Sequence, residues 1–368
     1  MTADVLSLRA LNRATLQRQL LLRRSDSSVL ATVEHLVGMQ AQLPLNPYVG
    51  LWSRLEGFQT DHLAQLLIDR EVVRIVTVRG TLHLVTADDC LVLRPLAQPV
   101  LDRELARHRD YASKLKDLDF APILAFARPL LEEKPRTGPQ LRAAMAARFP
   151  EHDAAALAFA CRNLLALVQV PPRGIWGRGG QVASTTAESW LGRSLATEPS
   201  IDDVVLRYFA AFGPATVADV AAWSRLTGLR EVVERVSGRL RAFRDERGRE
   251  LFDLPDAPRP DPDVPAPARF LPEYDNVVLS HADRTRFVSD EHRALLFSAE
   301  VPVHGSVLHD GALCGTWRID DDHATVVVRH VGRLTTGAAS ELEGEGHRLL
   351  QLIHPEASDH DVRFEVIR

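Results

Sequence analysis

Apolar residues in the first seventy positions recur every three or four residues, the spacing that places side chains on one face of a helix. The spacing predicts helices over residues 4–20, 28–40, 46–55 and 61–69. Arginines fill other positions of the first helix, giving it a basic face that is either solvated or turned toward a nucleic acid. Two β-rich runs, residues 72–78 and 81–85, then flank Arg79-Gly80 and predict a hairpin. Helices followed by a hairpin are typical of a winged helix, whose hairpin is the wing.

The same order of helices and then β-prone residues occurs twice more. Further helices are predicted over residues 121–131, 140–148, 153–168, 201–212, 217–223 and 229–236. A second wing is expected at residues 169–185, which are rich in proline, glycine and arginine, and a third at residues 240–252. The sequence therefore predicts three tandem winged-helix units with the bounds 1–118, 119–198 and 199–256.

The last third of the chain changes to β patterning. Five prolines within residues 256–268 indicate a linker or an extended strap. Asp310-Gly311 is a strong two-residue hairpin turn. Strands are predicted at residues 286–288, 299–308, 312–319, 324–330 and 362–366, with one helix at 341–352. Several strands at short intervals are typical of a small barrel or sandwich, and we expect a small β-barrel over residues 257–368 in an α+β protein.

The composition excludes some classes of protein. The chain has 368 residues, 45% of them hydrophobic and 25% charged, as in a globular and not a disordered protein. Its net charge of −5 excludes a uniformly basic coat, so nucleic-acid binding would need a local basic face. Three of the 44 basic residues are lysines and the rest are arginines, a choice that suits phosphate contact but also follows from GC-rich codons.

Nothing in the sequence indicates a cofactor or a membrane segment. The three cysteines are far apart, and none shows the Cys/His spacing of a zinc site or the pairing of a disulfide framework. The first 24 residues have no apolar run like that of a signal peptide, and no later run is long enough to span a bilayer. We therefore expect a cytoplasmic protein without a metal or an organic cofactor, and a monomer.

Gln40 and Gln42 flank Ala41 shortly before Pro44 and are the candidate reaction centre. Residues two apart lie on opposite faces of a helix but share a face in an extended segment. If the chain leaves its helix at Gln40, both amides can point one way and hold a water or polarise a sugar oxygen. The alternative is that both are surface glutamines at a fraying helix end.

Four stretches of the chain resemble the AlkZ-type DNA glycosylases, a family of winged-helix proteins. The run Gly-Met-Gln-Ala-Gln at 38–42 is similar to the glutamine–apolar–glutamine motif of that family. The others are Thr-Val-Arg-Gly-Thr-Leu-His-Leu-Val at 77–85, Leu-Pro-Glu-Tyr-Asp at 271–275 and Gly-Thr-Trp-Arg at 315–318. The resemblance covers nearly the whole chain, and the combination is far more specific than the glutamine motif alone.

The resemblance implies tandem winged helices around a C-terminal β-barrel, forming a C-shaped clamp on double-stranded DNA. It implies a DNA glycosylase that excises N7-alkylated purines and unhooks interstrand crosslinks, in repair or in self-resistance to an antibiotic. An N7-alkylated purine is cationic and leaves readily, so two neutral amides, Gln40 and Gln42, would suffice to position water and stabilise the sugar cation. No lysine lies near the motif in the sequence, which favours a monofunctional enzyme. A crosslinked base cannot flip freely, so an open cleft is expected.

DNA contacts are expected from two hairpins. The candidate residues are Arg79, Thr81 and His83 on the first wing and His309, Asp310 and Gly311 on the C-terminal hairpin. His83 alternates with two leucines and should face the polar side of its strand. The plainer interpretations are a surface histidine and an ordinary hairpin turn.

Two other functions fit the same patterns. Winged helices often serve transcriptional regulators, although three different units in one chain suit a clamp better than a symmetric operator reader. A non-catalytic binder of damaged DNA is the second alternative. Release of a free modified base would separate an enzyme from both.

Overall fold

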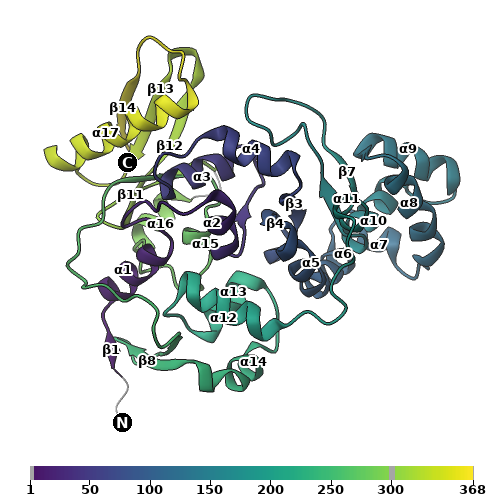
Figure 1. The fold of residues 1–368 in the computed structure, drawn as a ribbon, viewed down its shortest axis with the longest axis horizontal. Helices are drawn as coiled ribbons and strands as arrows, with labels where there is room; N and C mark the ends of the chain where they lie inside the picture. The colour runs from purple at the N-terminus through teal and green to yellow at the C-terminus, as the bar shows by residue number, and fades with distance from the viewer. Residues whose placement is uncertain (1–3, 298–302, 368) are drawn as a thin grey trace.

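Figure 1 shows the computed structural model, which describes residues 4–297 and 303–367. Its first part consists of the elements β1 (Val5–Leu6), α1 (Leu8–Arg18), α2 (Val29–His35), β2 (Met39–Gln40), α3 (Asn46–Arg54), α4 (Thr60–Ile68), β3 (Val72–Val76) and β4 (Leu82–Thr86). Four helices occur where the apolar spacing predicts them. The hairpin is also confirmed, because β3 and β4 pair antiparallel around the short 3-10 turn Val78–Gly80.

The second helix ends earlier than predicted. α2 stops at His35, after which Val37 and Gly38 take left-handed φ angles of 54° and 90°. A Cβ at Gly38 would lie 2.7 Å from a methyl group of Val85, so glycine is required at this close approach. The chain turns here into β2, which pairs antiparallel with β4. The predicted helix through Gln40 is therefore wrong, and Gln40 lies on a strand.

The basic face of α1 is covered by the proline-rich strap. The Nε of Arg9 donates to the carbonyl of Pro262 at 2.8 Å, and the Nε of Arg13 donates to that of Val264 at 2.7 Å. Arg13 and Arg18 are buried. Arg13 and Arg18 are therefore neither solvated nor available to DNA, whereas Arg9 holds the strap from an exposed position.

Residues 87–191 contain the elements α5 (Ala87–Leu96), α6 (Gln98–Arg107), α7 (Ala112–Leu115), α8 (Ala121–Glu133), β5 (Arg136–Thr137), α9 (Gly138–Arg148), α10 (Ala154–Leu164), β6 (Leu167–Gln169), β7 (Ala183–Thr186) and α11 (Ala187–Leu191). Thr137 and Gln140 form a capping box at the start of α9, which agrees with the predicted start. α10 is shorter than predicted, because the chain becomes strand β6 at Leu167.

The first two predicted wings form one sheet. β3 pairs with β4 on one side and with β6 on the other, where Ile75 lies opposite Val168. The strand order of the six-stranded sheet is β2-β4-β3-β6-β7-β5. Pairing along β3 satisfies backbone groups that an isolated hairpin would leave to water. The helices α7 to α10 lie together beyond one end of this sheet, on the right of Figure 1.

Residues 201–253 follow the prediction closely. They contain α12 (Ile201–Phe212), α13 (Val217–Ser224), α14 (Leu229–Arg235), β8 (Arg241–Asp245) and β9 (Glu250–Asp253). β8 and β9 pair antiparallel, which confirms the third hairpin. The N-terminal strand β1 adds to it in parallel, with Val5 opposite Arg244.

The C-terminal strands form an open sheet and not the predicted barrel. The elements are β10 (Arg269–Leu271), α15 (Asn276–Leu279), α16 (Asp290–Leu296), β11 (Gly305–His309), β12 (Ala312–Asp320), β13 (Thr325–His330), α17 (Thr336–Ile353) and β14 (Asp361–Val366). The strand order is β10-β11-β12-β13-β14, with β10 and β14 at its edges. Leu342 and Leu349 of α17 share a core with Phe270, Val307 and Val328 of the sheet. Because a helix buries the apolar face, the sheet need not close on itself.

Two further details differ from the prediction or lie beyond the structure. The expected strand at 286–288 is a turn whose apolar side chains, Phe287 and Val288, are buried. Residues 299–302 of the strand expected at 299–308 lie outside the described residues. No helix in the described part of the chain is long and apolar enough to cross a membrane.

Candidate active site

Gln40 ends the short strand β2, and Gln42 follows two residues later at a bend of the chain. Met39 and Ala41 point into an apolar core that includes Tyr48. Gln40 lies opposite His83 in the β2–β4 ladder and is buried, whereas Gln42 is exposed. If the chain stays extended through Ala41, alternation predicts that both glutamines lie opposite Met39 and Ala41. A strand and not a helix end carries Gln40, and a face shared with Gln42 stays a prediction.

The amide of Gln40 is held by a polar network. Nη2 of Arg79 donates to Oε1 of Gln40 at 2.7 Å and to Oδ1 of Asn276 at 3.1 Å. Nδ2 of Asn276 donates in turn to the carbonyl of Gly38 at 2.9 Å. The network thereby joins Arg79 and Asn276, which are 197 positions apart in the sequence, beside Gln40. The network fixes both the position and the rotation of the Gln40 side chain.

Arg79 is an unusual arginine, because it is buried without a carboxylate partner among the described residues. Its φ angle is +59°, and its Nη1 has no hydrogen-bond partner within the described chain. Burial, followed by the nearby charges of Arg225 and Arg284, lowers the pKa of Arg79 to about 10. The guanidinium therefore remains charged at neutral pH, and two further arginines lie near enough to influence it.

The loop from Leu271 to Asp275 lies beside the glutamine. Nδ2 of Asn46 donates to the carbonyl of Glu273 at 2.7 Å, and Nε1 of Trp317 donates to that of Leu271 at 2.8 Å. Burial raises the pKa of the Glu273 carboxyl. The site thus brings together three of the stretches that carry the family resemblance, residues 38–42, 77–85 and 271–275. The fourth stretch, 315–318, holds the loop 271–275 through Trp317.

A model of the family described as "DNA glycosylase AlkZ-like" matches residues 33–352 of the chain. The match covers most of the chain and all three of the converging stretches. The chain belongs to the AlkZ-like DNA glycosylase family.

Other comparisons agree with this assignment. The structure is similar to that of the DNA glycosylase AlkZ of Streptomyces sahachiroi, with a TM-score of 0.79 and 22% sequence identity, over 99% of this chain and all of the other. No curated protein matches the sequence. At this identity the structural likeness establishes the fold, and the family model establishes that the protein is a DNA glycosylase.

His83 is not on an exposed wing in this AlkZ-like protein. It does point away from the neighbouring leucines, but it is completely buried behind Arg79. Nδ1 lies 2.9 Å from the carbonyl of Thr81, which only accepts, so Nδ1 carries the proton. Burial and the charge of Arg79 lower the pKa of His83 to about 3. His83 thus faces the polar side of its strand as expected, but Arg79 covers that side, so a surface histidine is excluded and contact with DNA stays a prediction.

The C-terminal hairpin turn packs against α1, with Asp310 partly exposed. The carboxylate of Asp310 forms ion pairs with Arg9 and Arg13 of α1. A Cβ at Gly311 would lie 2.5 Å from polar atoms of Asn12 and Arg13. The tip contacts α1 and does not project freely as the expected groove probe, so its role in DNA binding stays a prediction. The same holds for Thr81, a half-buried residue whose hydroxyl donates to the carbonyl of Val78 at 3.1 Å.

The sequence did not single out Arg74 or Asn276 as parts of the site. Nη2 of Arg74 donates to the carbonyl of Ala41 at 2.9 Å, between the two glutamines. Its Nε and Nη1 are buried without a partner in the described part of the chain. Asn276 directly follows the quoted stretch 271–275, and that position was the one available signal for it. Arg74 lies within the apolar run of β3, and no pattern in the sequence marked it as part of the site.

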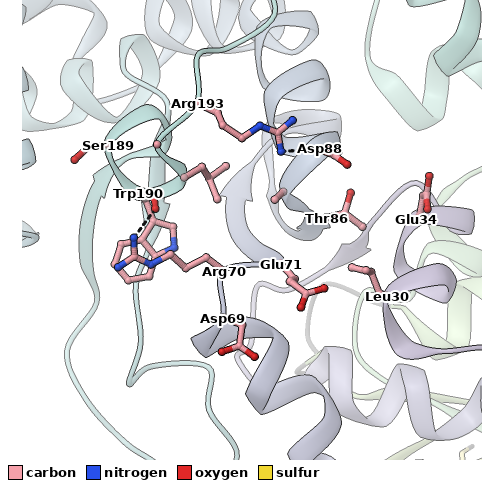
Figure 2. Close-up of a pocket in the computed structure, with 13 residues that line it drawn as sticks. Leu30, Glu34, Asp69, Arg70, Glu71, Thr86, Asp88, Ser189, Trp190 and Arg193 are labelled. Atoms are coloured by element: carbon pink, nitrogen blue, oxygen red, sulfur yellow. Dashed lines mark hydrogen bonds and ion pairs between the residues drawn. The ribbon is translucent and has the colours of Figure 1, made fainter.

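One small cavity lies at the site, and a larger cavity lies away from it. A cavity of about 10 Å³ touches Gln40, Asn46 and Asn276, and it has room for about one water and not for a purine. A larger cavity of about 490 Å³, shown in Figure 2, lies where β3 begins and β4 ends, away from the Arg79 turn. Carboxylates of Glu34, Asp69, Glu71 and Asp88 line it, which disfavours phosphate. No group of acidic, histidine or cysteine side chains in the described residues could hold a metal ion.

Proposed function

We propose that the protein is a monofunctional glycosylase that hydrolyses the N-glycosidic bond of N7-alkylated purines and unhooks interstrand crosslinks. The observation that carries this proposal is the charge state of the site. Gln40 and Gln42 are neutral amides, Arg79 is a cation, and His83 is held neutral by burial. None of these four groups is a good proton donor for a leaving base near pH 7, which favours a lesion that supplies its own activation. A purine alkylated at N7 is cationic and does so.

The reaction needs one water and no cofactor. The water oxygen forms a bond to C1′ of the deoxyribose, and the C1′–N9 bond breaks with its electron pair passing to the cationic purine. The water proton is lost to solvent. Positioning the water and stabilising the positive charge that develops on the sugar are the tasks left to Gln40 and Gln42, which we propose as the catalytic residues.

DNA would lie across units of helices and hairpins that we propose to be three winged-helix units arranged as a C-shaped clamp. Three sets of helices are each followed by an antiparallel hairpin, β3–β4, β6–β7 and β8–β9. Arg79, exposed Arg225 and half-buried Arg284 provide positive charge beside the glutamines. A single chain would hold one lesion in double-stranded DNA.

Base release from defined duplexes tests the proposal. Wild-type protein should liberate free modified base from DNA carrying N7-methylguanine and from DNA with an N7-linked interstrand crosslink, and leave an intact abasic strand. A Gln42→Ala variant should bind the same duplexes but release base at least about 100-fold more slowly, the usual effect of losing one preorganised polar group. Binding without release by the wild type would favour a regulator or a damage binder instead.

A further inference from the structure

The polarity of the network around Gln40 can be assigned without ambiguity. An arginine side chain only donates hydrogen bonds, so the Gln40 atom 2.7 Å from Arg79 must be the oxygen Oε1. The same rule assigns Oδ1 of Asn276 to Arg79, and the carbonyl of Gly38 then receives its Nδ2. A rotated Gln40 amide would set its own N–H group against the cationic guanidinium. Gln40 is therefore held with Oε1 toward Arg79 and Nε2 directed elsewhere.

Gln42 has no such constraint. It is exposed, and within the described residues no protein group forms a hydrogen bond with its side chain. Its amide can rotate to present either the oxygen or the nitrogen. The two glutamines of the motif thus differ in what they offer a substrate, although their side chains are chemically identical.

We propose that the two glutamines have opposite roles that cannot be exchanged: Gln40 acts as a hydrogen-bond donor through Nε2, and Gln42 acts as the acceptor through Oε1. Arg79 is the positioning residue that enforces this division. The inference rests on the proposed glycosylase reaction and adds the direction of each contact. Nε2 of Gln40 donates to a lone pair of the attacking water, and Oε1 of Gln42 accepts one of its hydrogens. The remaining lone pair of the water faces C1′.

A matched pair of substitutions tests this division. Gln40→Glu and Gln42→Glu each replace an amide with a carboxylate of the same shape, and each adds one negative charge near DNA. Glu at position 40 loses the donor and pairs with Arg79, so base release should fall about 100-fold or more. Glu at position 42 keeps an acceptor, so base release should stay within about tenfold of the wild type. Thermal melting should show that both variants are folded.

The pH profile gives a second readout that a purely structural role would not produce. In Gln42→Glu the acceptor is titratable, so the rate of base release should fall as the pH drops through the carboxyl pKa, about 4 to 5. The pH profile of the wild type should show no such decrease from position 42, because the glutamine amide does not titrate. Equal loss in both Glu variants, or an active Gln40→Glu, overturns the division of roles. Failure of the wild type to release any base instead contradicts the proposed function.

The role of Arg79 is tested by non-additivity. If Arg79 acts through Gln40, Arg79→Met should slow base release at saturating DNA in the wild type, but have little further effect in a Gln40→Met background. Independent, multiplying effects would show that Arg79 acts by another route, such as direct phosphate contact. The pair of Glu variants decides the main proposal even where Arg79→Met is poorly folded.

Discussion

Arg54 and Asp275 form a bidentate ion pair across 221 positions of the sequence, with N–O distances of 2.8 and 2.9 Å. Both side chains are buried, with 1% and 3% of their surfaces exposed. Arg54 ends α3, the helix that follows Gln42, and Asp275 caps α15, the helix that begins with Asn276. The pair therefore ties the helix that follows the glutamine motif to Asn276, the residue that binds Arg79 and the carbonyl of Gly38. Residues that are far apart in the sequence therefore build the candidate site together.

Removing one partner of this pair should destabilise the fold strongly. Asp275→Asn leaves a buried guanidinium without a counter-charge, and we expect the free energy of unfolding to fall by about 3 to 5 kcal/mol. Urea unfolding measures this loss. Asp88→Asn is the matched control, because it breaks an ion pair with Arg193 whose side chains are 81% and 54% exposed, and it should change the urea midpoint little. Equal losses of unfolding free energy in Asp275→Asn and Asp88→Asn would show that burial does not strengthen the dependence on the Arg54–Asp275 ion pair.

His83 should make stability depend on acid pH. Its pKa of about 3 in the folded protein lies below the ordinary value of 6.5. Between these two values the unfolded chain binds a proton that the folded chain does not, so stability falls as the pH drops below 6.5 and is unaffected above it. At pH 5 the effect is at most about 2 kcal/mol.

Comparison of unfolding free energies at pH 7.5 and pH 5 tests this. His83→Gln should lose less stability on acidification than the wild type, and some loss should remain because burial also lowers the pKa of His281 to about 3. His62→Gln, at an exposed position of α4, should behave as the wild type. Identical pH slopes in both variants would show that His83 is protonated within the folded protein.

The three cysteines should be unreactive in the folded protein. Burial raises the pKa of the Cys90 and Cys161 thiols to about 12 and that of Cys314 to about 11. The thiolate is the nucleophile, and raising the thiol pKa from its ordinary value of 9.0 to about 11 reduces the thiolate fraction of Cys314 about a hundredfold. A disulfide reagent should therefore modify three thiols rapidly in denaturant and none rapidly under native conditions. A fast native burst of one thiol would contradict this burial.

Local patterns in the sequence predicted the helices and hairpins well, and long-range contacts explain what they missed. α12 has the predicted bounds because its apolar spacing and its cap, Ser200, are local features. The end of α2 was missed because Val37 takes a left-handed φ that valine rarely adopts. The helix α17 begins at Thr336, five residues before the predicted start, and it covers one face of the C-terminal sheet. The sequence did not predict this contact, so the strands were expected to close into a barrel.

The glutamine pair was found from the sequence, but its surroundings were not. Alternation predicts that Gln40 and Gln42 share a face, and no local rule predicts that Arg79 is buried against Gln40. Arginines usually lie at the surface unless they are paired. Here the partners of Arg79 are a glutamine 39 positions before it and an asparagine 197 positions after it. Such a network arises only from tertiary structure.

Gly311→Ala should distinguish packing of the C-terminal hairpin from direct DNA contact. Gly311 has a φ of +77°, and a Cβ there would clash with Asn12 and Arg13 of α1. Gly332→Ala is the matched control, because Gly332 also has a positive φ, +66°, but open space around its Cβ position. Both variants should lose about 1 kcal/mol of stability to the left-handed backbone. Packing against α1 predicts a clearly larger loss of unfolding free energy for Gly311→Ala, measured in urea. A Gly311→Ala variant as stable as Gly332→Ala but weaker in DNA binding would instead favour a hairpin that contacts DNA.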